Sequence, residues 1–132
     1  MTMTGCRGGV SLPKKKILIV DDQHGVRALL KLALKKYDLK EAVNGQEAIK
    51  IAENWQPDLI LVDLKMPDMS GLDTISAIYK LNLNPRIVLM TAYNNMEMIQ
   101  DSVRISGVIS KPFDLLELVS LIDNILKEKP GT

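Results

Sequence analysis

Residues 16–22 read KILIVDD, an apolar run that is followed directly by the aspartates Asp21 and Asp22. The four residues ILIV offer no polar position, so a strand formed by them would be buried on both faces. Strands of this kind are typical of a parallel sheet that is covered by helices on either side. The stretch therefore predicts an α/β fold in which two carboxylates stand at the carboxyl end of a buried strand.

Short apolar runs and amphipathic stretches alternate along the rest of the chain. Strands are expected at residues 17–20, 39–43, 59–62, 87–90 and 108–110. Helices are expected over residues 26–34, from Asn44, after Ser70 and Gly71, at about residues 95–104, and from Leu115 to about Lys127. These elements predict a doubly wound (βα)₅ fold with a five-stranded parallel sheet of order 2-1-3-4-5, flanked by helices.

Two of the expected helices begin with the residue spacing of a capping box. Asn44 is followed three residues later by Glu47, and Asp114 is followed three residues later by Glu117. In such a pair the first side chain accepts a hydrogen bond from a free backbone N–H group of the first turn. The pairs therefore predict where these two helices start.

The composition is that of one globular domain. The 132 residues are 46% hydrophobic and 25% charged, and the formal net charge of +1 gives no general attraction to nucleic acid or to an anionic membrane. The single cysteine, Cys6, excludes an internal disulfide bond. Because no apolar run is long enough to span a membrane and no signal peptide is recognisable, a cytoplasmic protein is expected. Residues 1–13 are expected to be a disordered leader or tag, residues 14–128 the folded domain, and residues 129–132 a flexible C-terminus.

Four of the expected strands are followed by polar residues that a buried sheet does not need. Asp21 and Asp22 follow the first strand, Asp63 the third, Thr91 the fourth and Lys111 the fifth. In the expected order the first and third strands are neighbours, about 4.8 Å apart. Ligands of such sheets bind outside the carboxyl ends of the strands, where the strand order reverses. Three carboxylates, a hydroxyl group and an ammonium group are therefore expected to form one cluster.

The expected cluster predicts a site for a divalent cation and a phosphoryl group. Three carboxylates that lie close together repel one another unless a cation is present. Oxygen ligands without histidine or cysteine favour Mg²⁺ or Mn²⁺ over zinc. A carboxylate can accept a phosphoryl group as an acyl phosphate, and groups such as Lys111 and Thr91 can compensate the charge on its oxygens.

Similarity to a known family is carried by the segments ILIVDDQHGVRALL, NGQEAI, PDLILVDLKMPDMSGLD, RIVLMTAY and ISKPFD. Together they cover nearly all of residues 16–127 and resemble the response-regulator receiver domains of two-component signalling, which have a flavodoxin-like fold. The resemblance implies that Asp63 accepts a phosphoryl group from a sensor histidine kinase. It implies metal ligands at Asp21, Asp22, Asp63 and the backbone carbonyl of Lys65, a switch hydroxyl at Thr91, a phosphate-contacting lysine at Lys111, and a cis peptide bond between Lys111 and Pro112.

Two segments, DDQHGVRALL and TAYNNMEMIQDS, are similar to the receivers of sporulation phosphorelays. Such a receiver is a phosphotransferase that uses its own aspartyl phosphate to relay the phosphoryl group from a sensor kinase to a histidine phosphotransferase. The similarity implies a docking surface for a helical partner, made of Gln23, Gly25, Val26, Leu29, Pro112 and Phe113. For Phe113 a place in the core is an equally good interpretation. No nucleic acid or membrane partner is expected.

Two features depart from the family pattern. Val108 stands three residues before Lys111, where receivers commonly carry an aromatic residue or a histidine. The segment between Thr91 and Lys111 is slightly shorter than is usual in the family. The only histidine, His24, cannot form a metal site by itself.

Other functions remain as alternatives. A metal-dependent phosphatase for small molecules would usually carry a general acid two residues after its nucleophilic aspartate, where this chain has Lys65. A nucleotide or flavin binder would need a glycine-rich loop after the first strand, where this chain has VDDQHG. A phosphorylation-independent interaction module on the receiver fold, or a receiver fragment of a larger regulator, would share the fold and the aspartates.

Overall fold

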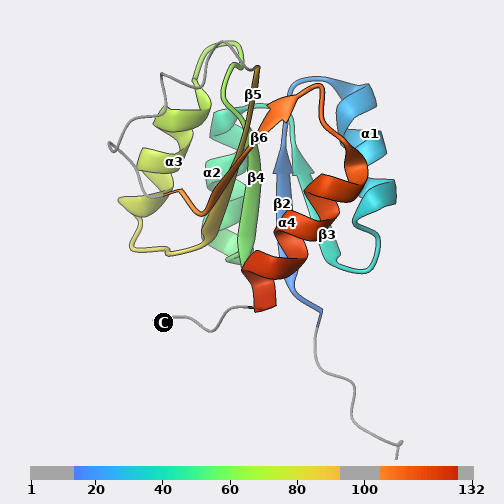
Figure 1. Cartoon of the computed structure of the whole chain (residues 1–132). Coiled ribbons are helices and arrows are strands. Elements are labelled where there is room, and N and C mark those ends of the chain that lie inside the picture. Colours follow the sequence, from blue (N-terminus) through green and yellow to red (C-terminus); the bar gives the residue numbers. More distant parts are fainter. Residues whose placement is uncertain (1–13, 93–104, 128–132) are drawn as a thin grey trace, which may run out of the picture.

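The computed structural model describes residues 14–92 and 105–127 of the chain. Along these residues the elements are β2 (Lys16–Val20), α1 (His24–Ala33), β3 (Asp38–Ala42), α2 (Gly45–Trp55), β4 (Leu59–Asp63), α3 (Gly71–Tyr79), β5 (Arg86–Ala92), β6 (Gly107–Lys111) and α4 (Leu115–Lys127). The strands form one parallel sheet of order β3-β2-β4-β5-β6, which confirms the predicted order 2-1-3-4-5 (Figure 1). The helix expected at about residues 95–104, the leader and residues 129–132 lie outside the described residues.

The sheet lies between two layers of helices, with α2 and α3 on one face and α1 and α4 on the other (Figure 1). Side chains alternate between the two faces along each strand. Leu18 and Val20 of β2 pack in the cluster under α2 and α3, whereas Ile17 and Ile19 pack in the cluster under α1 and α4. All four side chains are fully buried, so the apolar run ILIV forms a central strand that is covered on both faces, as its sequence predicts.

Side-chain caps fix the starts of three helices. Asn44 Oδ1 accepts a hydrogen bond from Glu47 N at 2.8 Å, and Glu47 Oε1 accepts one from Val43 N at 3.0 Å. Ser70 Oγ accepts from Asp73 N at 3.1 Å at the start of α3. Asp114 Oδ1 accepts from Leu116 N at 2.8 Å and from Glu117 N at 3.4 Å at the start of α4. The predicted starts of α2 and α4 are therefore confirmed. Within the described residues no helix is long and apolar enough to cross a membrane.

Gly71, the first residue of α3, lies directly against the end of β4. A Cβ atom at this position would lie 2.4 Å from the backbone oxygen of Asp63 and 3.0 Å from Cα of Leu64. The backbone N–H of Gly71 donates to the carbonyl oxygen of Leu64 at 2.8 Å. The absence of a side chain at Gly71 thus lets α3 start next to the aspartate that ends β4.

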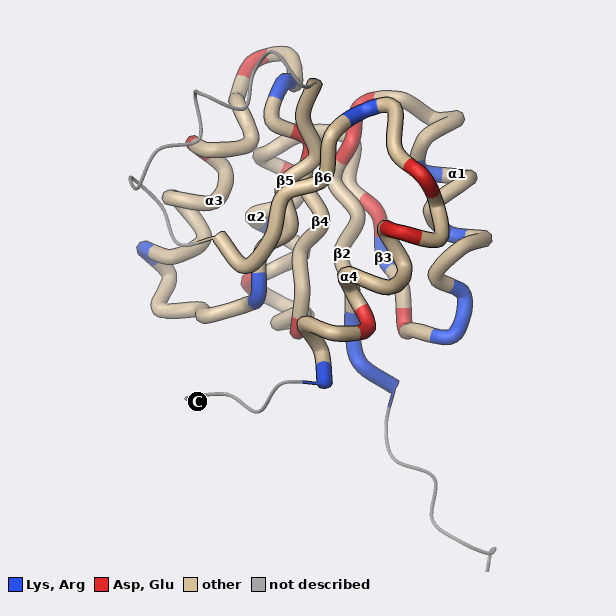
Figure 2. Tube along the Cα trace, in the orientation of Figure 1, with Lys and Arg blue, Asp and Glu red and all other residues tan. Residues whose placement is uncertain are grey.

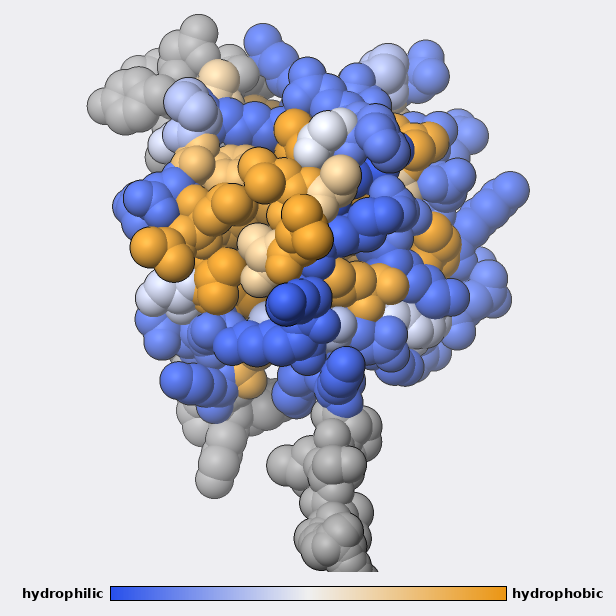
Figure 3. Space-filling view, turned by 90° about the vertical axis from the view of Figure 1, so that its right-hand side faces the viewer, coloured by the Kyte–Doolittle hydropathy of each residue, from blue (hydrophilic) through white to orange (hydrophobic). Residues whose placement is uncertain are grey.

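Charged and apolar residues are distributed unevenly over the surface. The basic stretch at residues 14–16 leads into the amino end of β2 (Figure 2), whereas Asp21 and Asp63 lie at the carboxyl ends of β2 and β4. On the side of α1 and α4, hydrophobic residues reach the surface (Figure 3). Leu29 and Leu32 of α1 are 44% and 71% exposed, and Leu116 of α4 is 81% exposed.

Candidate functional site

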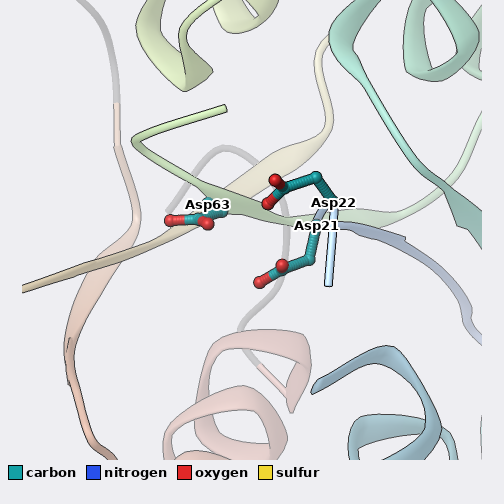
Figure 4. Close-up of side chains that lie close together, drawn as sticks. All are labelled: Asp21, Asp22 and Asp63. Atoms are coloured by element: carbon teal, nitrogen blue, oxygen red, sulfur yellow. The ribbon is translucent and has the colours of Figure 1, made fainter. Parts of the chain in front are cut away.

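Three aspartates from two neighbouring strands meet at the carboxyl edge of the sheet. Asp63 is the last residue of β4, and Asp21 and Asp22 directly follow β2, which pairs with β4 in parallel. One carboxylate oxygen from each of the three lies within 4.8 Å of the others. The carboxyl groups of Asp21 and Asp22 lie toward Asp63 (Figure 4). The structure therefore brings together the carboxylates that the sequence placed at one edge.

Asp21 and Asp63 are buried, whereas Asp22 is exposed. Asp21 is fully buried and Asp63 is 7% exposed. Asp21 Oδ1 accepts a hydrogen bond from Gln23 N at 2.9 Å, and Asp63 Oδ1 accepts one from Lys65 N at 3.4 Å. These bonds use one oxygen of each buried carboxylate, while Asp22 forms the side of the cluster that is open to solvent.

Lys111 reaches the aspartates from the edge strand β6. Its Nζ atom donates to Asp21 Oδ2 at 2.8 Å and to Asp63 Oδ2 at 3.2 Å. The peptide bond between Lys111 and Pro112 is cis, as the family resemblance implied. One ammonium group thus bridges the two buried carboxylates.

The pKa values of Asp63 and Lys111 are both raised, for different reasons. Burial is the largest influence on the pKa of Asp63 and raises it, the charge of Lys111 lowers it, and the nearby Asp21 raises it again, so that the pKa lies above its ordinary value. For Lys111, burial lowers the pKa, but its hydrogen bonds to Asp21 and Asp63 and their charges outweigh this effect and raise it. Lys111 therefore remains charged, and its charge only partly offsets the effect of burial on the pKa of Asp63.

Thr91 and Lys65 lie beside this cluster. Thr91 is 1% exposed on β5, one residue beyond Met90, which pairs with Asp63. Its hydroxyl donates to the carbonyl oxygen of Ala92 at 3.2 Å. Lys65 is exposed and follows Asp63 by two residues. Their positions agree with the sequence argument, and their roles toward a phosphoryl group or a metal stay predictions.

Arg27 belongs to the surroundings of the site, although the sequence did not predict this. Its side chain is buried under α1, and Nη1 donates to the backbone oxygen of Asp21 at 2.8 Å. Its Nε donates to Glu41 Oε1 on β3 at 2.8 Å. The sequence does contain one indication of its buried position: Arg27 lies between the apolar residues Val26 and Leu30, on the inward face of α1.

The residues expected to dock a partner lie on α1 and on the connection from β6 to α4. Gln23, Gly25 and Pro112 are exposed. Phe113 and Val26 are half-buried and both pack against the cluster under α1 and α4. Phe113 thus contributes to the core and keeps part of its surface exposed, while docking itself stays a prediction.

Val108 is half-buried and packs against the cluster under α2 and α3. It pairs with Leu89 of β5. At the position where receivers commonly carry an aromatic residue or a histidine, this chain therefore has an aliphatic side chain that contributes to the core.

Comparisons with known proteins agree with this geometry. The model of the response regulator receiver domain matches residues 17–123. Sporulation initiation phosphotransferase F of Bacillus subtilis is 38% identical over 119 residues, covering 87% of this chain and 96% of that protein. The chemotaxis protein CheY of Thermotoga maritima is 32% identical over 118 residues, covering 86% of this chain and 98% of that protein. Among solved structures, the chemotaxis protein CheY4 of Vibrio cholerae superposes with a TM-score of 0.78 at 26% identity, covering 85% of this chain and 98% of that one.

Proposed function

The chain belongs to the response regulator receiver family, and on this basis we propose that it accepts a phosphoryl group on Asp63 from a sensor histidine kinase and passes it to a histidine phosphotransferase. One observation carries the proposal: the carboxylates of Asp21, Asp22 and Asp63 converge within 4.8 Å at the end of two buried strands, with Lys111 bridging two of them. Packing of a hydrophobic core does not require this arrangement. A site that accepts a phosphoryl group uses both the converging carboxylates and the ammonium group.

The donor set fits Mg²⁺ or Mn²⁺. All candidate ligands are oxygen atoms, from Asp21, Asp22, Asp63 and the backbone carbonyl of Lys65, and no histidine or cysteine lies among them. Burial, and to a lesser degree the nearby Asp21, raise the pKa of Asp63 despite the charge of Lys111, so a bound cation would favour its ionised form. When bound, such a cation neutralises charge on phosphoryl oxygens during transfer.

The residues of this chain have distinct tasks in the proposed transfer. A carboxylate oxygen of Asp63 attacks the phosphorus of the phosphohistidine, so that an O–P bond forms while the P–N bond breaks and its electron pair returns to the imidazole. The ammonium group of Lys111 and the hydroxyl group of Thr91 would bind the phosphoryl oxygens. Transfer onward to a histidine phosphotransferase reverses these bond changes and restores the free Asp63 carboxylate.

Two finer parts of the proposal concern the partner and the pathway. Gln23, Gly25, Val26, Leu29, Pro112 and Phe113 would form the docking surface, since they lie on α1 and next to Lys111 and most of them are exposed. A role in a sporulation phosphorelay is supported by the 38% identity to sporulation initiation phosphotransferase F over most of both chains.

The proposal is tested with phosphoramidate, a small donor that carries the same P–N bond as phosphohistidine. We expect that wild-type protein incubated with phosphoramidate and Mg²⁺ gains the mass of one phosphoryl group, that hydroxylamine removes it, and that EDTA prevents its addition. Asp63→Ala should gain none, whereas Asp68→Asn, at an exposed aspartate in the connection that follows β4, should react as wild type. If the wild type forms no acyl phosphate, a phosphorylation-independent interaction module becomes the better conclusion.

A further inference from the structure

Arg27 is a buried charged residue outside the cluster of aspartates. It is 8% exposed, and its guanidinium group makes two hydrogen bonds of 2.8 Å in different directions, to the backbone oxygen of Asp21 and to the carboxylate of Glu41. Burying a guanidinium group is costly unless its donors are paired. The fold therefore keeps this charge in the interior by means of these two partners.

The partner Glu41 is itself held in place. It lies on β3, the strand next to β2, and its second carboxylate oxygen accepts a hydrogen bond from Lys31 at 2.5 Å. Hydrogen bonds from Lys31 and then from Arg27 lower the pKa of Glu41 against the opposing effect of burial, so Glu41 is an anion at neutral pH. Glu41 thus anchors Arg27 to the neighbouring strand of the sheet.

The bond from Arg27 reaches the backbone of the aspartate pair, not its side chains. The carbonyl group of Asp21 belongs to the peptide unit that joins Asp21 to Asp22, and a peptide unit is planar and rigid. On the other side of Asp21, its N–H group donates to the carbonyl oxygen of Ala42 at 3.2 Å. The peptide units on both sides of Asp21 thus each have a hydrogen-bond partner that holds their orientation, and this orientation influences the directions in which the side chains of Asp21 and Asp22 leave the backbone.

We propose that Arg27 is a positioning residue for the divalent-cation site. Its guanidinium group, anchored by Glu41, holds the peptide unit between Asp21 and Asp22 so that both carboxylates face Asp63. This inference rests on the proposed function, because it assigns Arg27 a role in binding the cation of that same site. Partners that orient metal ligands commonly affect metal affinity about 10-fold to 100-fold.

Charge and position predict opposite effects when Arg27 is neutralised. By charge alone, removing a cation near three carboxylates strengthens the binding of Mg²⁺. By position, the loss of the hydrogen bond to Asp21 lets the peptide reorient and weakens binding. A purely structural role lowers the melting temperature but leaves the Mg²⁺ affinity of the folded protein unchanged. The sign of the change therefore separates the three explanations.

The experiment is a calorimetric titration of Mg²⁺ into the unphosphorylated protein of 132 residues, well below its melting temperature. Arg27→Met, which keeps the apolar stem but has no donor, is expected to bind Mg²⁺ about tenfold more weakly than wild type. Arg27→Lys should retain part of the affinity for Mg²⁺. Its ammonium group can donate to the backbone oxygen of Asp21, but it cannot reproduce the two separately directed bonds to Asp21 and Glu41. Lys31→Met is the comparison variant: it removes a more exposed cation from the same Glu41 but leaves the bonds from Arg27 to Glu41 and to Asp21, so it should weaken Mg²⁺ binding much less than Arg27→Met does.

The outcomes are distinct. Unchanged or tighter binding by folded Arg27→Met overturns the inference while leaving the proposed function intact. Should Arg27→Met fail to fold, Glu41→Gln replaces it, because this variant weakens only the anchor; weaker binding supports the inference and wild-type affinity overturns it. A wild-type protein that binds no Mg²⁺ contradicts the proposed cation site itself and the inference with it.

Discussion

At the scale of single residues, the burial of Asp63 opposes the ionised form that the proposed chemistry requires. Asp63 is nearly buried at the end of β4, which disfavours its charge, yet the proposed chemistry needs its carboxylate. Burial raises its pKa above the value in the unfolded chain, and the charge of Lys111 only partly offsets this. Relative to the unfolded chain, the folded protein without a cation therefore holds the proton of Asp63 more tightly, and ionisation of this group lowers the free energy of unfolding.

This pKa shift predicts that Asp63→Asn stabilises the metal-free protein at neutral pH. The stability that a raised carboxyl pKa contributes is present below the ordinary pKa of about 4 and is lost as the pH rises through the higher pKa of the folded state. Asparagine is neutral throughout, so at pH 7 the variant should exceed wild type in the free energy of unfolding, by about 1.4 kcal/mol for every pH unit by which folding raises the pKa of Asp63. Urea unfolding at several pH values in EDTA measures the difference, which should shrink toward acidic pH.

Asp68→Asn is the control for this measurement. Asp68 is exposed in the connection that follows β4, and its φ of 71° is one that asparagine tolerates well. Equal stabilisation by both substitutions, or none by Asp63→Asn, would contradict the conclusion that burial of Asp63 opposes its charge.

Lys111 should influence cation binding and phosphorylation in opposite directions. Lys111→Met removes the positive charge that bridges Asp21 and Asp63, so Mg²⁺ should bind about threefold more tightly or better. The phosphoryl oxygens lose a charged donor, so phosphorylation by phosphoramidate at saturating Mg²⁺ should slow by about 100-fold. Calorimetry and a time course of acyl phosphate formation give the two values, with Lys80→Met at an exposed site as control. A parallel loss of both properties would indicate that Lys111 acts by holding the fold together.

The aspartates could be predicted from the sequence because their place depends on local pattern alone. A polar residue that directly follows a buried parallel strand must lie at the carboxyl edge of the sheet, whatever the loops do. The role of Arg27 could not be predicted in this way. Its partners are a backbone oxygen after β2 and Glu41 on β3, and their proximity follows from how α1 packs over the sheet.

At the scale of helices and strands, the contact between α3 and β4 has a testable consequence. Gly71→Ala would place a methyl group 2.4 Å from the backbone oxygen of Asp63, so α3 must shift away from the site. We expect a loss of about 1–3 kcal/mol in the free energy of unfolding, the usual cost of overpacking. Gly25→Ala is the matched change in α1, where nothing lies within 4 Å of the added atom. It should raise stability by about 0.5 kcal/mol, because alanine favours helix over glycine.

Urea unfolding of the two variants measures this contrast. Similar free energies for both would show that α3 can begin elsewhere and that the close approach is not required.

Strand boundaries show what the hydrophobic pattern alone cannot determine. The edge strand β3 was expected at residues 39–43 and spans Asp38–Ala42, because its pairing with β2, from Lys16 with Asp38 to Val20 with Ala42, sets its limits. Its sequence DLKEA is largely polar, so the apolar pattern marked it weakly. The central strand β4 is apolar up to Val62, and only its final residue, Asp63, lies beyond the predicted range.

At the scale of the whole molecule, contacts between distant segments hold the sheet and its helices in one body. Asp123 of α4 accepts hydrogen bonds from the hydroxyl group of Tyr37 and, at 2.9 Å, from Lys36, both of which precede β3. These hydrogen bonds join segments that lie far apart in the sequence, and the hydrophobic pattern of the chain could not predict them. The order of the strands, by contrast, was predictable, since few arrangements satisfy right-handed crossovers in a doubly wound sheet.

The stability of the whole molecule should depend on Mg²⁺, because a cation that binds only the folded cluster shifts the folding equilibrium. At a free concentration ten times its dissociation constant, Mg²⁺ adds about 1.4 kcal/mol, which corresponds to roughly 5 °C in melting temperature for a domain of this size. Thermal melts of wild type with MgCl₂, compared with KCl at equal ionic strength, measure the shift.

The same melts of Asp63→Asn test whether the effect of Mg²⁺ arises at the cluster of aspartates. The variant lacks one of the three converging carboxylates, so it should begin with a higher melting temperature in EDTA and gain much less from Mg²⁺ than wild type. The two effects share one cause, the negative charge of Asp63 in a buried position, which either a cation or a neutral side chain relieves. A wild-type melt that does not respond to Mg²⁺, or a variant that responds equally, would separate the cation site from Asp63 and contradict this cause.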